Sequence, residues 1–293
     1  MATWGAVDMG SSGARVARVR IEDTTTRLDS EVTFIDKSVG RRAFVKALRA
    51  GLADVTGADL AGAEPAGAGV TGVGVAIAGP TDPSTGEVLF AGAYPWAKGP
   101  LASRLARKLD VPVTVVNDAE AHLSAHIVGH AHPLICLTLG TALGFAMTDA
   151  AGAVRRPRPD ADWEFGHVFL TPPAPGDDET DAARAKIFWA LGSRGLGEAQ
   201  DRHGDSAGAQ QFAADLATFV YNLSMTFQPR TIVLAGGIAA SIGDVLAPAS
   251  TALLERRWPP AVRWKPPTVL VSPHGGTSGL LGAAVVAATA STR

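Results

Sequence analysis

Hydrophobic and polar residues alternate in several short stretches, which is the period-two pattern of β-strands. Residues 4–8 and 15–21 form such a pair around a Gly/Ser-rich turn, and this pattern predicts a hairpin whose second arm is half exposed. Buried strands are predicted at residues 72–78, 111–116 and 231–235. Residues 134–147 repeat the strand–glycine turn–strand pattern of the N-terminal hairpin.

Helices are predicted where apolar residues recur every three or four positions. Phe44, Leu48, Leu52 and Val55 show this spacing, and the same criterion predicts helices at 101–109, 119–128, 212–227 and 279–289. Residues 56–69 are rich in Gly, Ala and Pro and predict a loop. Strands that alternate with helices indicate an α/β fold, and the two similar strand–turn–strand units indicate internal duplication.

Composition narrows the class of protein. The chain has 293 residues, 46% of them apolar and 18% charged, which is typical of a globular protein large enough for two lobes. The net charge of −2 predicts no general affinity for nucleic acid or anionic membranes. Its single cysteine, Cys136, excludes a disulfide framework within the chain. We see no signal peptide, and the apolar stretches are interrupted well short of a bilayer span, so we expect a cytoplasmic location.

The first glycine-rich turn, Asp8-Met-Gly-Ser-Ser-Gly13, follows the first predicted strand. Glycines remove side chains, so backbone N–H groups can approach phosphate oxygens closely. Gly10, Ser12 and Gly13 offer such donors, and Asp8 is placed to hold Mg²⁺ through water. It is not a Walker loop, because it lacks Gly-Lys-Ser/Thr and a strand follows it. An ordinary tight hairpin explains the same residues.

The second glycine-rich turn, Leu139-Gly-Thr-Ala-Leu-Gly144, has the same character. Gly140 and Gly144 flank Thr141, whose hydroxyl is the natural donor of this turn. A plain turn is again the alternative. Its occurrence after a second acid-containing strand favours phosphate binding at both turns.

Asn117 and Asp118 end another predicted strand. They can act as a helix N-cap, because both residue types cap helices well and a helix is predicted from Ala119. They can also belong to an active site, since ligands of α/β folds bind at the carboxyl ends of strands. Asp118 would then accept the proton of an attacking hydroxyl.

Glu164-Phe-Gly-His167 lies in a proline-rich stretch between Pro157 and Pro175. Loop polar residues often carry function, and Glu164 and His167 can hydrogen-bond vicinal hydroxyls. A turn with solvated charges is the alternative.

Two further clusters are expected to be solvated rather than functional. His122 and His126 have the spacing of helical zinc ligands, but the glutamate of the metalloprotease pattern is absent. We therefore expect a solvated helix face there. The basic stretch 155–158 is likewise expected to be a solvated loop.

Taken in order, these motifs resemble those of the sugar kinases of the ROK family, within the actin/hexokinase-like fold. The resemblance covers nearly the whole chain. Beyond the motifs above, it is carried by Gly74-Val-Ala-Ile-Ala-Gly-Pro-Thr-Asp82, Thr85-Gly-Glu-Val88 and Val233-Leu-Ala-Gly-Gly-Ile238.

The resemblance implies a role for each motif. It makes Asp118 the catalytic base. It places the sugar at Asn117, Glu164, His167, Gly79 and Pro80. It places phosphates at Asp8, Gly10, Ser12, Gly13, Gly140, Thr141 and Gly144, and adenosine at Gly236 and Gly237. It also implies two α/β lobes around a cleft, residues 1–116 with about 279–293 and residues 117–278, and it allows a homodimer.

Departures from the family pattern concern the sugar side. Residues 172–181 contain no cysteine, so the structural zinc of many members should be absent. Phe188 takes the place of a second sugar-contacting glutamate, and Tyr94 lies where a sugar-binding Asn often precedes Pro95-Trp96. The phosphotransfer half therefore matches better than the sugar half, and glucose itself is in doubt. Zinc-free members include polyphosphate glucokinases.

The sequence therefore predicts a kinase that uses ATP and Mg²⁺ to phosphorylate a primary hydroxyl of a hexose, amino sugar or sugar-like cyclitol. One alternative keeps the fold and uses polyphosphate as donor, although the chain has no long basic run. The other is a non-catalytic sugar-sensing protein. Such relatives carry an N-terminal helix-turn-helix, whereas here the first phosphate strand is expected from Trp4.

Overall fold

The computed structural model describes residues 2–22, 25–57, 69–82, 84–158, 161–172, 174–176 and 178–292. Most of the predicted loop 56–69 lies outside these residues. The chain divides into two compact units by its internal contacts. Unit 1 comprises Met1–Val128, Arg156–Asp162 and Thr277–Arg293, and unit 2 comprises Gly129–Arg155 and Trp163–Gly276. The two lobes expected from the sequence stay a prediction, and their boundaries differ from those of the compact units.

Unit 1 is built on a mixed sheet with the strand order β3-β2-β1-β5-β8, in which β4 also pairs with β2. Its strands are β1 (Ala2–Met9), β2 (Gly13–Glu22), β3 (Thr25–Leu28), β4 (Thr33–Asp36), β5 (Val73–Ile77) and β8 (Val113–Asn117). The predicted N-terminal hairpin is confirmed, since β1 and β2 pair antiparallel. Strands β5 and β8 continue the sheet in parallel with β1. A short hairpin, β6 (Thr81–Asp82) and β7 (Glu87–Val88), follows β5.

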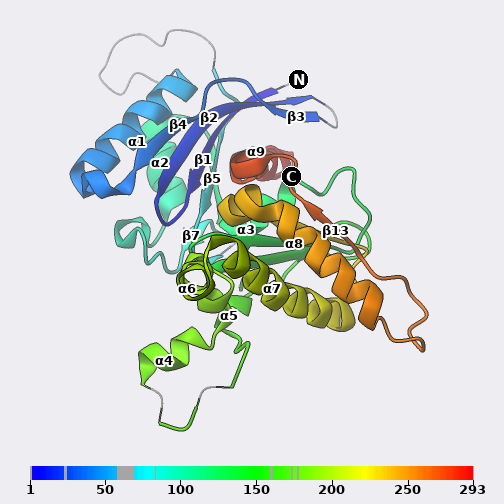
Figure 1. Cartoon of the computed structure of the whole chain (residues 1–293). Helices are drawn as coiled ribbons and strands as arrows, with labels where there is room; N and C mark the ends of the chain where they lie inside the picture. The colour runs from blue at the N-terminus through cyan, green and yellow to red at the C-terminus, as the bar shows by residue number, and fades with distance from the viewer. Residues whose placement is uncertain are drawn as a thin grey trace. The chain divides into compact units, whose positions relative to one another are not determined.

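Helices cover both faces of this sheet (Figure 1). They are α1 (Arg41–Thr56), α2 (Leu101–Leu109), α3 (Asp118–Ser124) and α9 (Ser278–Ser291), with 3-10 turns at Lys37–Val39, Pro95–Ala97 and Gly275–Thr277. Alternate residues of β1 divide between the faces: Val7 and Met9 pack towards α1, whereas Trp4 and Ala6 pack towards α9. This alternation is the sheet periodicity that the sequence predicts.

Helix α9 approaches its neighbours so closely that two glycines are required. A Cβ on Gly282 would collide with the backbone carbonyl oxygen of Ala121 in α3. A Cβ on Gly74 in β5 would collide with the carbonyl oxygen of Ala283 in α9. The backbone of α9 therefore packs directly against the backbone of the sheet and of α3. The small apolar residues of α9 permit this close contact.

Unit 2 repeats the strand arrangement of unit 1. Its strands are β9 (Leu134–Leu139), β10 (Leu143–Thr148), β11 (Val154–Arg155), β12 (Thr231–Ala235) and β13 (Thr268–Val271). They follow the order β11-β10-β9-β12-β13, in which a hairpin continues into two parallel strands. The series β10-β9-β12-β13 thus matches β2-β1-β5-β8, and the predicted internal duplication is confirmed.

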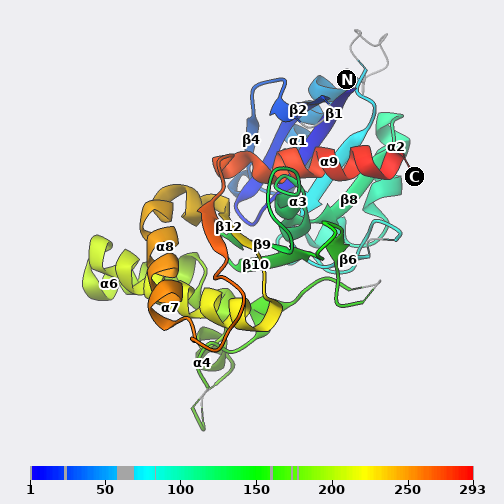
Figure 2. The same cartoon turned by 90° about the vertical axis from the view of Figure 1, so that its right-hand side faces the viewer.

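Unit 2 also contains the helices that follow (Figure 2), and all but the first of them contribute residues to its large apolar core. They are α4 (Glu179–Arg184), α5 (Ile187–Ala190), α6 (Ser193–His203), α7 (Asp205–Phe227) and α8 (Gly236–Arg257), with a 3-10 turn at Phe165–His167. The apolar stripe of α7, including Phe212, Leu216 and Leu223, is buried as its spacing predicts.

Helix α8 corrects the expectation that the apolar stretches of the chain are interrupted well short of a bilayer span. It is 22 residues long and has a mean hydropathy of 1.4 in its most apolar stretch, so length and composition alone would let it cross a membrane. Ile238, Leu246 and Leu254 are nevertheless buried in the core of unit 2, and α8 packs against β9, β12 and β13. A core helix of this kind passes the same test, so this helix is weak evidence for a membrane span.

We predict that Gly282→Ala destabilises the protein by about 1–3 kcal/mol, because the new methyl group must push α3 away from α9. Thermal unfolding followed by circular dichroism measures this as a lowered Tm. Gly197→Ala in α6 is the matched control, since its Cβ would meet no atom within 4 Å and alanine favours helix. A Gly282→Ala variant that melts with the wild-type protein would contradict the close packing.

Candidate active site

Three strand ends of unit 1 meet at one edge of its sheet. Met9, Ile77 and Asn117 lie in register on the parallel strands β1, β5 and β8. The residues that follow them are therefore neighbours: the first glycine-rich turn, the Gly79-Pro80 turn and Asp118. Since ligands of α/β folds bind at the carboxyl ends of strands, this edge is the candidate site of unit 1.

The first glycine-rich turn is held from three sides. The hydroxyl of Tyr94 donates to the carbonyl oxygen of Gly10 at 2.7 Å. The backbone N–H of Lys37 donates to the carbonyl oxygen of Ser12 at 3.1 Å. A Cβ on Gly13 would collide with the carbonyl oxygen of Ile35 in β4. Gly13 is thus required by strand packing, whatever it binds.

The top of this turn is open. Ser11 and Ser12 are exposed, and their backbone N–H groups find no hydrogen-bond acceptor among the described residues. Adjacent free N–H groups on a fixed turn form an anion-binding concavity. The arrangement at Ser11 and Ser12 suits an anion, and phosphate binding by Gly10, Ser12 and Gly13 stays a prediction.

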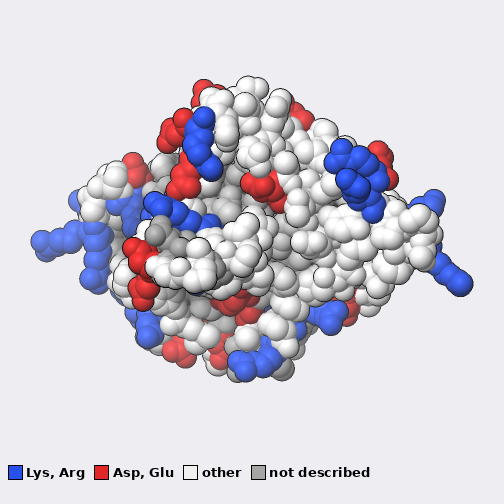
Figure 3. Space-filling model, turned by 60° about the horizontal axis from the view of Figure 1, so that its bottom comes forward, with Lys and Arg blue, Asp and Glu red and all other residues white. Residues whose placement is uncertain are grey.

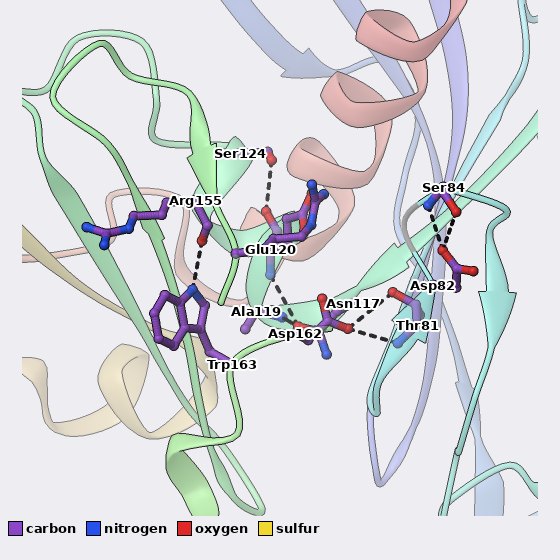
Figure 4. A network of polar contacts seen from close by, with 11 residues as sticks. Thr81, Asp82, Ser84, Asn117, Ala119, Glu120, Ser124, Arg155, Asp162 and Trp163 are labelled. Carbon is purple, nitrogen blue, oxygen red and sulfur yellow. Dashed lines mark hydrogen bonds and ion pairs between the residues drawn. The ribbon is translucent and has the colours of Figure 1, made fainter. Parts of the chain in front are cut away.

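Asn117 joins two strand ends through its side chain (Figure 4). Its Oδ1 accepts from the backbone N–H groups of Ala119 at 2.9 Å and Glu120 at 3.4 Å, which caps α3. Its Nδ2 donates to the carbonyl oxygen of Gly79 at 3.0 Å. Gly79 has a φ of +125°, and a Cβ there would collide with the carbonyl oxygen of Phe90. The cap predicted for Asn117 is present, and the same side chain also fixes the turn after β5.

Asp118 is the first residue of α3 and is only partly exposed. Burial raises its pKa to about 7, and the negative charges of Asp8 and Asp162 act in the same direction. The backbone N–H of Ala119 donates to its Oδ1 at 3.0 Å and opposes the shift in part. A carboxyl group with this pKa can take up and release a proton near neutral pH.

Asp8 lies on β1 against the first turn of α9. Its side chain is buried, and Arg15 on the neighbouring strand approaches it at 3.5 Å. A Cβ on Gly279 of α9 would come within 2.8 Å of the Asp8 carboxylate and 3.1 Å of His122 Nε2. Gly279 therefore leaves room for the acid and the imidazole to lie on either side of it.

The expectation that His122 and His126 form a solvated helix face is wrong. His122 is 7% exposed and His126 is fully buried, and α3 already ends at Ser124 instead of reaching residue 128. His122 Nδ1 lies 2.7 Å from the hydroxyl of Ser278. Burial lowers the pKa of His122 and favours the neutral ring, while the charge of Asp8 acts in the opposite direction. Both histidines are buried. Local periodicity alone does not reveal that α9 covers this part of the chain.

Asp162 is a site residue that the sequence analysis missed. Its carboxylate accepts from the backbone N–H of Thr81 at 2.8 Å and from the Thr81 hydroxyl at 3.3 Å (Figure 4). The same segment is held by Arg156, which forms a two-pronged ion pair with Glu120 of α3. The expected solvated loop at 155–158 is therefore wrong for Arg156. No local signal in the sequence indicates that residues 156–162 return to unit 1.

The second glycine-rich turn is the candidate site of unit 2. Gly140 precedes β10, Gly144 lies within it opposite Thr138, and Thr141 is exposed at the tip. The backbone N–H of Ser193 donates to the carbonyl oxygen of Gly140 at 2.8 Å, and Gly192 fits closely against the carbonyl oxygen of Thr141. The turn is thus supported from the start of α6.

Gly236 and Gly237 begin α8 beside the second turn. Gly236 has a φ of +90°, and a Cβ there would come within 2.6 Å of the carbonyl oxygen of Leu139. Gly237 has open space around it, since a Cβ there would meet no atom within 4 Å. Free N–H groups and the dipole of a long helix make its N-terminus suitable for an anionic or polar ligand.

The Glu164–His167 motif presents its polar side chains outwards from the core of unit 2. Phe165 packs against Phe145 in a tilted arrangement with ring centroids 4.3 Å apart, whereas the side chains of Glu164 and His167 are 54% and 67% exposed. The two side chains lie 3.8 Å apart. Phe188 lies beside the His167 ring, with centroids 5.8 Å apart.

Two carboxylates of unit 1 are suited to a magnesium ion. Mg²⁺ is commonly held by one or two carboxylates together with substrate phosphates. Asp8 and Asp118 supply hard oxygen donors at the sheet edge that also carries this turn, and the negative charge of Asp8 acts on Asp118. Among the described residues there is no group of three or more His, Cys, Asp or Glu side chains that could hold a metal.

Comparison with known proteins agrees with this arrangement. A family model described as ROK family matches residues 5–178. The glucokinase of Streptomyces coelicolor is 26% identical over 240 residues, which is 68% of this chain and 74% of that protein.

Solved structures match over almost the whole chain. A ROK family glucokinase from Streptomyces griseus, solved with glucose and AMPPNP, has a TM-score of 0.74 at 23% identity and covers 98% of this chain and 99% of its own. A putative N-acetylmannosamine kinase from Listeria monocytogenes has a TM-score of 0.73 at 21% identity, with 99% of each chain covered. These likenesses show the actin/hexokinase-like fold that the motifs predict. With more than half of its length matched by the family model, the chain belongs to the ROK family.

Proposed function

We propose that this protein is a sugar kinase that transfers the γ-phosphoryl group of ATP to a primary hydroxyl of a hexose, amino sugar or sugar-like cyclitol. The sugar phosphotransferase class is the one that its glucokinase and hexokinase relatives share. The observation that carries the proposal is the position of Asp118. This carboxyl group lies beside the Gly79-Pro80 turn, at the sheet edge that also carries the first glycine-rich turn with its free N–H groups.

In this proposal, Asp118 accepts the proton of the acceptor hydroxyl. The hydroxyl oxygen forms a bond to the γ-phosphorus, the bond between that phosphorus and the bridging oxygen breaks, and ADP leaves. Such transfers depend mainly on positioning and on stabilisation of charge. A base whose pKa is about 7 is matched to this task near neutral pH.

The glycine-rich turns are the proposed phosphate and nucleotide contacts. Gly10, Ser12 and Gly13 supply donors in unit 1, and Gly140, Thr141 and Gly144 do so in unit 2. Gly236 and Gly237 leave backbone accessible to adenosine at the start of α8. Mg²⁺, when bound, neutralises phosphate charge, and Asp8 would hold it, directly or through water.

The sugar contacts are proposed residue by residue. Glu164 and His167 are exposed, and their side chains can accept and donate hydrogen bonds to ring hydroxyls. Gly79 and Pro80 form the turn beside Asp118, and Asn117 keeps one N–H of its amide beyond the bond to Gly79. Phe188 offers an apolar surface next to His167, which favours an acceptor with fewer polar groups on that side. The cytoplasmic location and the homodimer remain predictions.

An ADP-release assay across glucose, mannose, glucosamine, N-acetylated amino sugars and cyclitols tests the proposal. We expect turnover with at least one of these acceptors, and a loss of about 10³-fold or more in kcat for Asp118→Asn with little change in KM. Asp82→Asn, an acid of the neighbouring hairpin, should keep wild-type turnover.

Parallel reactions with polyphosphate in place of ATP identify the donor. Turnover with polyphosphate alone would replace ATP in the proposal. Equal turnover of Asp118→Asn and wild type would remove Asp118 from catalysis, and the absence of turnover with every acceptor and donor would favour a sugar-sensing role.

The pH profile follows from the same carboxyl group. Asp118 acts as a base only when ionised, so kcat/KM should fall about tenfold per pH unit below a pKa of about 7. Asp162→Asn removes one of the charges that raise this pKa, and the acidic limb should move to lower pH. Asp82→Asn should leave the limb in place. A wild-type limb near the ordinary aspartate pKa of about 4 would contradict the assignment.

Because the pKa of Asp118 is raised in the folded protein, we also predict that the stability of the fold depends on pH. In the unfolded chain the group ionises with a pKa of about 3.9, whereas in the folded protein it does so at about 7. Stability therefore falls as the pH rises between these two values, since the unfolded state releases its proton first. We predict that Asp118→Asn raises Tm by a few degrees at pH 8 and leaves it unchanged near pH 4. A Tm difference that is independent of pH would contradict this.

A further inference from the structure

A groove on unit 1 lies apart from the residues of the candidate active site. It runs between α1 and α2 and has a volume of about 990 Å³. Its lining comes from α1, α2 and Trp96 and contains only apolar and basic residues. The function proposed above uses none of these side chains.

The floor of the groove is formed by apolar residues at helical spacing. Val45, Leu48 and Leu52 come from α1, and Leu101, Leu105 and Leu109 come from α2. Val45 and Leu105 are partly exposed and present apolar surface to the groove, whereas the other four are buried beneath them in the core of unit 1. Positions three to four residues apart form a continuous stripe on one face of a helix. Two such stripes side by side are the surface into which the ridge of a third helix packs.

The rims of the groove carry cations. Arg41, Arg42, Lys46 and Arg49 project from α1, and Lys108 projects from α2. Among the residues that the structure describes, none of these five has an acidic partner within ion-pair distance. Arg104 differs, because its guanidinium donates to the carbonyl oxygens of residues 96, 97 and 98 and is part of the frame.

Such a concentration of one sign of charge is unusual for this chain, whose net charge is −2. On the face shown in Figure 3, most of the surface is uncharged, and basic side chains lie at its left-hand end, the side on which Figure 1 draws α1, as well as at its right-hand end. Unpaired cations close together repel one another, so a ligand with several negative charges would relieve this repulsion.

We propose that the groove between α1 and α2 is a docking site for an acidic amphipathic helix of a partner protein. The apolar face of that helix would cover the stripe of leucines, and its acidic flanks would pair with the cations on both rims, as in helix-in-groove recognition. Helix α2 has nine residues and is therefore about 14 Å long, which matches two to three turns of a docked helix.

The composition of the groove argues against simpler occupants. A bare polyanion such as polyphosphate would pair with the rims but leave the partly exposed side chains of Val45, Trp96 and Leu105 uncovered. An uncharged amphipathic helix would cover the floor and leave five cations unpaired. The sequence shows no long basic run because the cations come from two helices that are more than 40 residues apart in the chain.

Fluorescence anisotropy with a synthetic peptide tests the proposal. The labelled probe is a helical peptide with Leu and Ile along one face and Glu on both flanks, measured without sugar or nucleotide so that the result does not depend on kinase activity. We expect saturable binding that weakens with salt. Lys108→Glu should weaken it about tenfold or more, and Lys46→Glu with Arg49→Glu should do the same.

Arg107→Glu is the matched control, because Arg107 is the exposed neighbour of Lys108 on α2 but does not line the groove. This variant should bind the probe within about twofold of wild type. Equal weakening by Arg107→Glu and Lys108→Glu would reduce the effect to general electrostatics and overturn the proposal. It would also fail if a peptide with Lys in place of Glu bound equally well, or if polyphosphate bound through these residues while the Glu peptide did not.

Discussion

The side-chain amide of Asn117 is the contact on which the candidate active site of unit 1 depends. Its oxygen begins α3 at the end of β8, and its nitrogen holds the carbonyl group of Gly79 at the end of β5. Asp118, one residue later, is therefore presented by a capped helix and lies next to a fixed turn. Because a single residue performs both tasks, the direction of α3 and the path of the chain after β5 cannot change independently.

Negative charge is concentrated at this edge, although the carboxylates repel one another. Asp8, Asp118 and Asp162 come from three separate parts of the chain, and their mutual repulsion adds to the burial of Asp118. Arg15 approaches Asp8 from the solvent side, while His122 lies close to it in a buried position. Folding by itself would favour fewer acids here. Groups whose pKa is shifted in this way are concentrated at functional sites, which is consistent with the function proposed for this edge.

Much of the fold could be predicted from local periodicity. The hairpins, the buried strands and the helix around Phe212 followed from alternation and three-to-four spacing, and the order of motifs indicated the family. The strand ends that carry Gly79 and Asp118 were found in the same way, because the carboxyl ends of parallel strands share an edge.

What local patterns could not predict is contact between distant segments. Asp162 reaches Thr81 across 81 positions of sequence, and Tyr94 reaches Gly10 across 84. His122 was expected in solvent because α9, which covers it, comes more than 150 residues later. The basic groove was missed for the same reason, since its cations belong to two helices.

The position of α9 at the end of the chain has a consequence for biosynthesis. Strands β1 and β5 are translated before unit 2, whereas α9, which covers one face of their sheet, is translated after it. The sheet face that carries Trp4, Ala6 and Gly74 therefore stays uncovered while residues 163–276 are translated. Those residues can complete their own core during this time. The second half of the nascent chain is thus expected to mature before the first, in reverse of the order of translation.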